Sequence, residues 1–175
     1  MFGPRFRARV VGAFVLLLAV SVSGSPGFQP ALAKTSVRVL PSEDGLELAH
    51  DEGIASSKTI LPLYRTGGIR YFSAGVGLEE RAADYPPFPL KIVFVVGGKP
   101  YLAQVDVHIV APSGPLKLAI PRDRVTGPWL FVDLPDGTYE ISAMWNGRTE
   151  INKAVNVSNG MTRVIYFRWP ERPAH

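Results

Sequence analysis

The chain has 175 residues, of which 46% are hydrophobic and 19% are charged, and its formal net charge is +4. This length and composition suffice for one globular domain with a buried core. Since there is no cysteine, the composition excludes a disulfide framework, a catalytic thiol, a thiolate metal site and a lipoprotein anchored through a thiol.

The first 33 residues have the pattern of a secretory signal peptide. Three arginines lie between residues 5 and 9 and precede the apolar segment Val10–Val22, which is 13 residues long. A helix that crosses a bilayer needs about 20 apolar residues, so the shorter segment is typical of a signal peptide. Small residues at Ala31 and Ala33 indicate cleavage between Ala33 and Lys34. Cleavage after Gly24 and retention as an uncleaved anchor are the alternatives.

Removal of residues 1–33 changes the charge of the chain. These residues carry three arginines and no acid, so the remaining 142 residues have a net charge of +1. They contain no cluster of lysines and arginines of the kind that phosphate binding requires, so we expect no nucleic-acid partner. We expect a protein exported to the periplasm, with secretion as the alternative and without a membrane anchor after cleavage.

Residues 34–67 are expected to form a polar N-terminal arm. Its hydrophobic periodicity is weak, and short strands at Ser36–Leu40 and Leu46–Ala49 compete with a loosely held segment. The pattern strengthens at Ile60–Tyr64 and Ile69–Phe72, which are predicted to be strands joined by a glycine-containing turn.

Residues 68–89 are predicted to contain the second of these strands, a short helix and a proline-rich linker. Apolar residues at helical spacing predict the helix over Leu78–Tyr85. Glu79 and Glu80 lie in its first turn, where a carboxylate interacts favourably with the positive end of the helix dipole. The prolines at positions 86, 87 and 89 then prevent the helix from continuing.

Residues 90–170 are predicted to be a β-sandwich. Apolar and polar residues alternate along short segments separated by turns, and no long helical pattern intervenes. Strands are expected at 90–96, 105–109, 116–120, 129–132, 138–143, 151–157 and 164–169. The predicted fold class is therefore mainly β: an antiparallel sandwich of about seven strands, transthyretin-like or immunoglobulin-like, with one short helix near 78–85.

Two segments resemble a known family. Leu134–Ala143 has the Leu-Pro-x-Gly-x-Tyr signature of carboxypeptidase regulatory-like domains, with Trp129 and Phe131 upstream. Ala74–Ala82 and Gly127–Leu130 together resemble exported proteobacterial proteins that contain such a domain. The resemblance implies a transthyretin-like, or prealbumin-like, sandwich in the periplasm without catalytic activity. It does not imply carboxypeptidase activity, because the domain is an appendage of the enzyme after which it is named.

The residues that could carry chemistry do not form a recognisable metal site. Asp106 and His108 lie two residues apart and are expected on one face of a strand, but zinc sites normally need three or four ligands. His50-Asp51-Glu52 is a polar segment typical of a solvated loop, and His175 is the last residue. We therefore expect no metal and no cofactor.

The segment Gly75-Val76-Gly77 before the expected helix has the form of a phosphate cradle. Glu79 and Glu80 would repel an anion there, so a tight turn from strand to helix is the preferred interpretation. The chain also lacks a Gly-x-Ser-x-Gly or Ser-x-x-Lys motif. We expect no enzyme; a hydrolase that places a histidine beside a carboxylate and a nucleophile is the less favoured alternative.

The three tryptophans are the candidates for contact with a partner. Trp129 is expected in the core, whereas Trp145 beside the Asn146-Gly147 turn and Trp169 at the end of the last strand are expected to be half exposed. The predicted function is that of a non-catalytic periplasmic domain that binds an envelope protein or a peptide, for example through a strand added to a sheet edge. A secreted or surface structural or adhesive module is the alternative.

Overall fold

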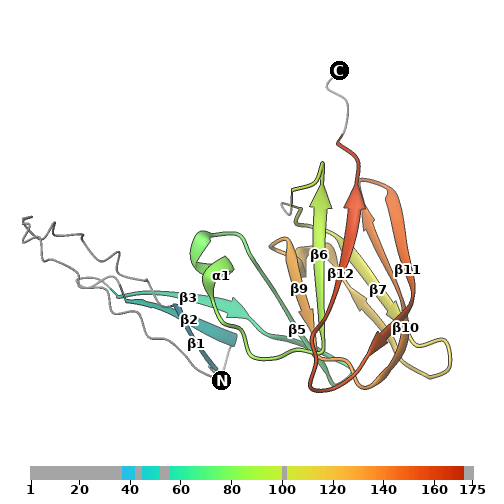
Figure 1. Cartoon of the computed structure of the whole chain (residues 1–175), viewed down its shortest axis with the longest axis horizontal. Helices are drawn as coiled ribbons and strands as arrows, with labels where there is room; N and C mark the ends of the chain where they lie inside the picture. Colours follow the sequence, from blue (N-terminus) through green and yellow to red (C-terminus); the bar gives the residue numbers. More distant parts are fainter. Residues whose placement is uncertain (1–36, 42–44, 52–55, 100–101, 172–175) are drawn as a thin grey trace, which may run out of the picture. The chain divides into compact units, whose positions relative to one another are not determined.

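Extended backbone dominates the computed structural model, which describes residues 37–41, 45–51, 56–99 and 102–171 (Figure 1). Within these ranges lie twelve strands, the short helix α1 (Leu78–Ala82) and one 3-10 turn at Arg122–Arg124. No helix in the described ranges is long and apolar enough to cross a membrane. The expected signal peptide, with its cleavage site between Ala33 and Lys34, lies outside them.

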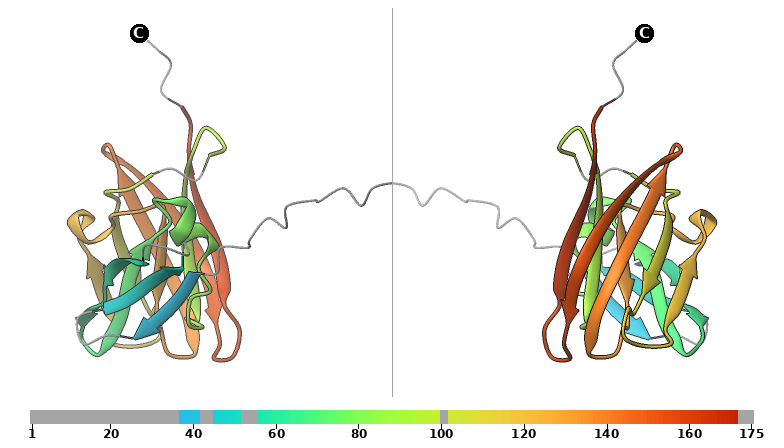
Figure 2. Two further views of the ribbon diagram at one scale, coloured as in Figure 1. Left: turned by 90° about the vertical axis from the view of Figure 1, so that its left-hand side faces the viewer. Right: turned by 90° about the vertical axis from the view of Figure 1, so that its right-hand side faces the viewer.

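Two sheets pack face to face as a sandwich (Figures 1 and 2). The five-stranded sheet has the order β12–β6–β9–β5–β4, and the four-stranded sheet has the order β11–β10–β7–β8. The first contains β4 (Tyr64–Thr66), β5 (Ile69–Ala74), β6 (Leu90–Val96), β9 (Trp129–Val132) and β12 (Arg163–Trp169). The second contains β7 (Asp106–Val110), β8 (Lys117–Ile120), β10 (Gly137–Trp145) and β11 (Arg148–Val157). The mainly β class and the sandwich predicted from the alternating pattern are confirmed.

The sandwich extends further towards the N-terminus than residue 90. β5 pairs with β9 along Tyr71–Ala74, and β4 pairs with β5, so both strands are part of the five-stranded sheet. The segment expected as one strand over Ile60–Tyr64 divides at Leu63, where the chain passes from the N-terminal sheet into β4.

One strand pair of the sandwich is parallel. β6 and β12 run in the same direction, with Leu90 opposite Arg163 and Val96 opposite Trp169. The chain between them forms the whole four-stranded sheet and β9, which supplies the long connection that a parallel pair requires. The five-stranded sheet is therefore mixed, whereas the four-stranded sheet is antiparallel as expected.

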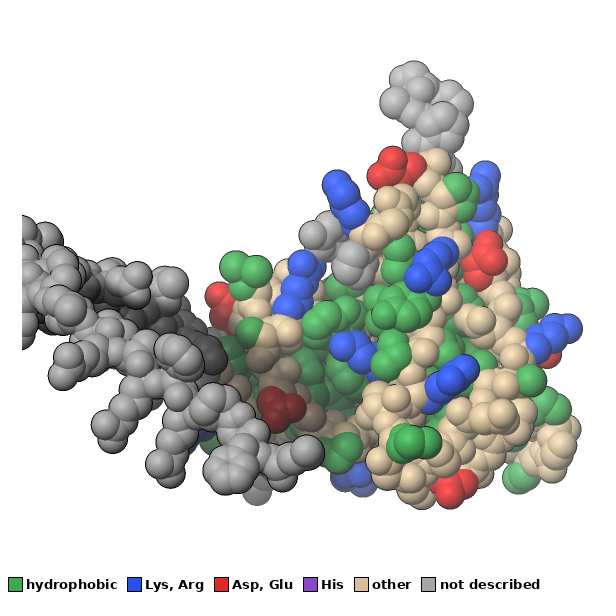
Figure 3. All heavy atoms as spheres, viewed as in Figure 1, with side chains coloured by type: hydrophobic (Ala, Val, Ile, Leu, Met, Phe, Trp, Pro, Cys, Tyr) green, Lys and Arg blue, Asp and Glu red, His purple; other side chains and the backbone are tan. Residues whose placement is uncertain are grey.

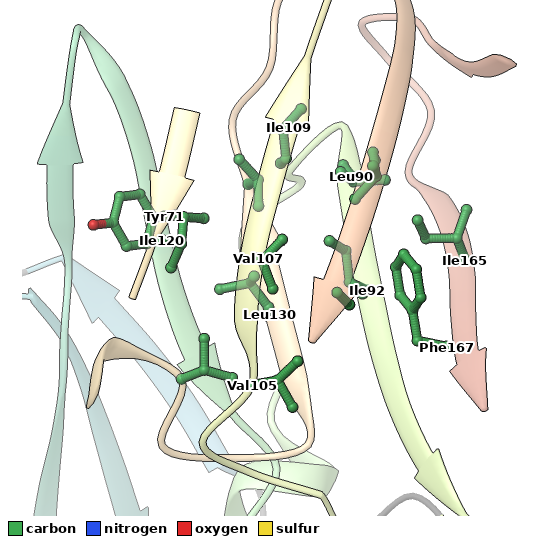
Figure 4. Packing of buried hydrophobic residues seen from close by; sticks show 14 of the residues in the cluster. Tyr71, Leu90, Ile92, Val105, Val107, Ile109, Ile120, Leu130, Ile165 and Phe167 are labelled. Atoms are coloured by element: carbon green, nitrogen blue, oxygen red, sulfur yellow. The ribbon is translucent and has the colours of Figure 1, made fainter. Parts of the chain in front are cut away.

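The main core fills the space between the two sheets (Figure 4). Because side chains alternate across a strand, each strand buries every second residue here. The five-stranded sheet contributes Leu90, Ile92 and Phe94 of β6, Leu130 and Val132 of β9, and Ile165, Phe167 and Trp169 of β12. The opposite sheet contributes, among others, Val107, Ile109, Ile120 and Ile141.

The Leu-Pro-x-Gly-x-Tyr segment forms the corner between β9 and β10. The hydroxyl of Tyr139 donates a 2.8 Å hydrogen bond to the carbonyl oxygen of Pro135, and this tyrosine is only 3% exposed. Burial, and secondly the carboxylate of Asp136, raises the pKa of the Tyr139 phenol. The arrangement resembles the tyrosine corner of immunoglobulin-like sandwiches. These residues therefore stabilise the fold.

The described part of the N-terminal arm is a three-stranded antiparallel sheet. Its strands are β1 (Val37–Pro41), β2 (Gly45–Asp51) and β3 (Ser56–Pro62), with β2 in the centre. The left-hand view of Figure 2 shows these strands, coloured blue to teal, in front of the sandwich. Of the two alternatives for the arm, ordered strands are therefore observed.

A second core joins this N-terminal sheet to the outer face of the five-stranded sheet. It contains Leu46, Leu48, Leu61, Phe72, Ala74, Phe88 and Phe131. The rings of Phe72 and Phe131 stack with their centroids 4.6 Å apart, and Phe88 meets Phe72 edge-on at 5.0 Å. Such aromatic pairs stabilise a core beyond the area they bury.

Helix α1 is shorter than expected. It ends at Ala82 instead of Tyr85, because Ala83 has an extended conformation and a proline follows Tyr85. The extended chain lets the Tyr85 ring reach the second core, 5.1 Å from the ring of Phe131, while its hydroxyl donates to the carbonyl oxygen of Glu80. The side chain of Tyr85 thus packs in the second core, and residues 83–85 do not form the last helical turn that was expected.

The second core predicts which residues of the N-terminal sheet contribute to stability. We expect Leu48→Ala to lower the free energy of unfolding by about 2–5 kcal/mol, because it opens a cavity under a fully buried leucine. Ile60→Ala in the same sheet is the matched control, since Ile60 is 54% exposed and exposed substitutions usually change stability by about 0.5 kcal/mol or less. Urea unfolding measures both variants. Equal, small losses would mean that this sheet does not pack on the sandwich.

Candidate functional site

The N-terminal sheet leaves part of the five-stranded sheet's outer face uncovered. On β6 the side chains that point outward are Lys91, Val93 and Val95, and on β12 they are Val164, Tyr166 and Arg168, since their neighbours point into the main core. None of these six belongs to the second core. Among the described residues, the second core therefore does not extend over the half formed by β6 and β12.

A cavity of about 380 Å³ lies on this half of the sheet. We call it the outer-face groove; it is lined by Lys91, Val93, Val95, Gly98, Trp129, Val164, Tyr166 and Arg168. Val93 and Val95 are each only 5% exposed and form its floor, whereas Val164 is 41% and Tyr166 47% exposed. Figure 3 shows hydrophobic side chains with lysines and arginines among them on this face.

Trp129 and Lys91 form the wall of the groove next to the second core. The Lys91 amine lies 3.5 Å from the centroid of the Trp129 ring and 5.1 Å from that of Phe131, as in a cation–π contact. Burial of the half-buried Lys91 side chain lowers the pKa of its amine. The wall therefore presents a partly desolvated cation on an aromatic surface.

The opposite wall is formed by β12. The guanidinium carbon of Arg168 lies 4.6 Å from the centroid of the Tyr166 ring. In the described parts of the chain, the ion pairs are Lys58–Glu47, Arg70–Asp133, Arg124–Asp123 and Lys153–Glu140. Neither Lys91 nor Arg168 thus pairs with a described carboxylate.

The turn that leads into α1 packs against the ring of Trp129. Gly75 has a φ of +98°, and a Cβ atom there would lie 2.9 Å from Cδ2 of the indole. Only glycine allows the backbone to take this conformation and approach the ring so closely. The buried hydroxyl of Ser73 accepts a hydrogen bond from the Gly127 amide and lies 3.1 Å from the Trp129 carbonyl oxygen, which joins β5 to β9 at this point.

The phosphate-cradle alternative is contradicted in this turn. One carboxylate oxygen of Glu80 accepts hydrogen bonds from the amides of Gly75 and Val76, at 2.6 and 3.0 Å. The guanidinium of Arg81 donates to the carbonyl oxygen of Gly75. The amides that would bind a phosphate are therefore occupied by the protein's own carboxylate.

The two tryptophans expected to be half exposed have different positions. Trp145 is half buried against the main core, with its ring 6.2 Å from that of Trp169. Trp169 is 2% exposed, so the expectation of exposure is wrong for this residue. Its indole donates a hydrogen bond to the carbonyl oxygen of Arg148, which satisfies the buried N–H. Neither of them lines the outer-face groove.

The polar residues of β7 and β10 lie on the far side of the sandwich. His108 is opposite Ser142 in the pairing of these strands, and Asp106 is on the same face as His108. His108 is exposed, and the carboxylate of Asp106 accepts the amide of Arg122. Among the described residues, no hydrogen bond joins the side chains of Asp106, His108 and Ser142. The described residues also include no group of three or more potential metal ligands. The side chains of His50 and Asp51, and residues Glu52 and His175, lie outside the description.

Trp129, expected in the core, is half-buried: it packs against the second core and also lines the outer-face groove. Its neighbours Leu130 and Val132 face the main core, so the alternation along β9 necessarily turns Trp129 and Phe131 to the other face. That signal could have placed Trp129 outside the main core. It could not have shown that Phe131 is covered by the N-terminal sheet while Trp129 borders an open groove.

Comparisons with models of protein families, with curated proteins and with solved structures found no match to this chain. The resemblance to carboxypeptidase regulatory-like domains therefore remains a proposal.

The contact between Gly75 and Trp129 can be tested by substitution. Gly75→Ala and Gly160→Ala both place a side chain at positive φ, but only at Gly75 would the new Cβ meet other atoms. A positive φ costs roughly 1–2 kcal/mol for a non-glycine residue, and forced displacement of the indole adds roughly 1–3 kcal/mol. We expect Gly75→Ala to be the more destabilising in urea and to alter the tryptophan emission of the folded protein. Equal losses with unchanged emission would contradict the contact.

Proposed function

We propose that this chain is an exported, non-catalytic β-sandwich module that binds an envelope protein or a peptide through the outer-face groove. The observation that carries the proposal is the uneven cover of the five-stranded sheet. In the described parts of the chain, the second core buries one half of its outer face, and the other half carries the groove, with an apolar floor and aromatic and cationic walls.

The composition of the groove suits contact with a protein. Tryptophan, tyrosine and arginine are enriched among the residues that contribute most to binding at protein interfaces. Trp129, Tyr166 and Arg168 surround a floor of valines that is already almost free of solvent. A partner side chain beside these walls would bury the exposed apolar surface of Val164 and Tyr166, which are 41% and 47% exposed.

The edge of β12 is less suited to binding than its face. The amide of Asn152, on β11, lies 3.4 Å from the carbonyl oxygen of Tyr166 and donates to it. This oxygen points away from β6, on the side where an added strand would have to pair. The contact supports docking on the sheet face over the addition of a strand to this edge.

A binding role is also supported by the distribution of polar residues. His108 is on the exposed face of the four-stranded sheet, on the opposite side of the sandwich from the groove. A general base must lie within hydrogen-bonding reach of the group it activates, so His108 is too far away to act on a molecule bound in the groove.

Export to the periplasm and membership in the carboxypeptidase regulatory-like domains belong to the same proposal. They are supported by the signal-like N-terminus and by the Tyr139 corner.

Site-specific photocrosslinking tests the proposed surface. A benzophenone amino acid would replace Tyr166 in the groove or, as a control, Ile151 on the outer face of the four-stranded sheet; these residues are 47% and 51% exposed. We expect irradiation of cells that express the full chain to give a discrete protein adduct from position 166 and none from position 151. The adduct would be identified by mass spectrometry after separation of periplasm, membranes and medium.

Two outcomes would contradict the proposal. The first is the absence of an adduct from position 166, and the second is the same set of adducts from both positions. Recovery of the protein in the medium or at the cell surface would favour the structural or adhesive module over a periplasmic domain.

A further inference from the structure

We propose that the occupant of the outer-face groove is an extended acidic peptide segment with the pattern acid-x-apolar-x-acid. This inference rests on the proposed function and gives the chemistry of the partner at the same site. It follows from the charges of the groove, from the spacing of its two cations and from the residues between them.

The charges of the groove are unbalanced. Lys91 and Arg168 are among its lining residues, and the described lining residues include no aspartate or glutamate. No described carboxylate forms an ion pair with either cation. Carboxylates form shorter and stronger hydrogen bonds with such cations than neutral groups do. An acidic partner is therefore complementary to this surface and a basic one is not.

The environment of Lys91 strengthens this argument. Its amine is held against the rings of Trp129 and Phe131, which offer only the weak attraction of their π faces. Burial has already removed part of its hydration, and the pKa of the amine is lowered as a result. A carboxylate from a ligand would supply the full opposite charge that the described residues do not provide.

The strand register gives the distance along the strands between the backbone positions of Lys91 and Arg168. Lys91 lies opposite Val164, Val93 opposite Tyr166, and Val95 opposite Arg168. Their backbone positions are therefore four residues apart along the strands, which is about 13 Å, with the Lys91 amine over the Trp129 ring and the Arg168 guanidinium over the Tyr166 ring. An extended peptide spans the same distance, about 13 Å, between residues i and i+4, and these residues point to the same side.

The residue midway between the two acids would face the centre of the groove. This position lies over Val93, which is 5% exposed, and beside the ring of Tyr166. An apolar side chain at i+2 fits there, because it would cover the exposed apolar surface of Tyr166 and Val164 without losing hydrogen bonds. A single small anion could satisfy one cation but would leave the side chains of Tyr166 and Val164 exposed.

Synthetic peptides test the pattern directly. The probe is the end-capped peptide Ser-Glu-Thr-Leu-Thr-Glu-Ser, titrated into the ¹⁵N-labelled protein and followed by NMR. Two controls isolate its features. In the first, both glutamates are replaced by glutamine. In the second, Ser-Glu-Thr-Leu-Glu-Thr-Ser, the composition is unchanged but the second acid is moved to the opposite side of the extended chain.

We expect the probe to shift the indole signal of Trp129 and the amide signals of β6 and β12. Each control peptide should bind about tenfold or more weakly, because a lost charge-assisted contact is worth about 1.5–3 kcal/mol. Affinity for the probe should fall with increasing salt. It should also fall as the pH rises through the pKa of Lys91 in the free protein, since binding of a carboxylate favours the protonated amine.

Protein variants assign the effect to the two cations. Arg168→Met and Lys91→Met should each reduce the preference for glutamate over glutamine, and Lys91→Met should also remove the alkaline loss of affinity. Lys117→Met, on the exposed side of β8 in the other sheet, should bind the probe as the parent does. Arg168 is exposed, so its variant is informative even if Lys91→Met folds poorly.

Several results would overturn the inference. They are equal affinity for the probe and the glutamine peptide, equal affinity for the probe and the shifted peptide, absence of binding by all three, and shifts confined to the four-stranded sheet. Crosslinking from position 166 together with any of these results would retain the groove as a binding surface and reject the acidic pattern. Loss of the position-specific crosslink would instead reject the proposed function itself.

Discussion

The alternation of side chains along β9 is the constraint on which the rest of the structure depends. Leu130 and Val132 face the main core, so Trp129 and Phe131 must face outward. The outer face of the five-stranded sheet therefore carries large aromatic rings, which would be exposed to solvent if nothing covered this face. The N-terminal sheet and the segment around Phe88 cover Phe131 and Phe72, and through them the second core forms.

The outer-face groove is a consequence of where this cover stops. It extends over β5 and part of β9 but not over the outward residues of β6 and β12. Trp129 lies at the boundary, with the backbone of Gly75 on one side and the Lys91 amine over its ring. The same residue therefore ends the second core and begins the groove. A substitution that loosens the cover would be expected to change the groove as well.

Most strands could be predicted from the sequence, because alternation reports directly which residues share a face. It gave β6 and β9 with their observed bounds, and it explains why Val93 and Val95, although outward, are apolar. What lies against each face could not be predicted in the same way. Trp169 was expected near the surface because it ends a strand, yet the fold places β11 beside it and buries the indole. The groove combines β6, β9 and β12, which are distant in sequence, so no local pattern indicated it.

Nuclear Overhauser contacts of methyl groups in the protein test the central claim most directly, because one spectrum reports on both halves of the sheet face. The account predicts contacts from the methyl groups of Leu46, Leu48 and Leu61 to the rings of Phe72, Phe88 or Phe131. It predicts none from those leucines to the methyl groups of Val93, Val95 or Val164. Absence of the first set, or presence of the second, would contradict a cover that ends between β9 and β6.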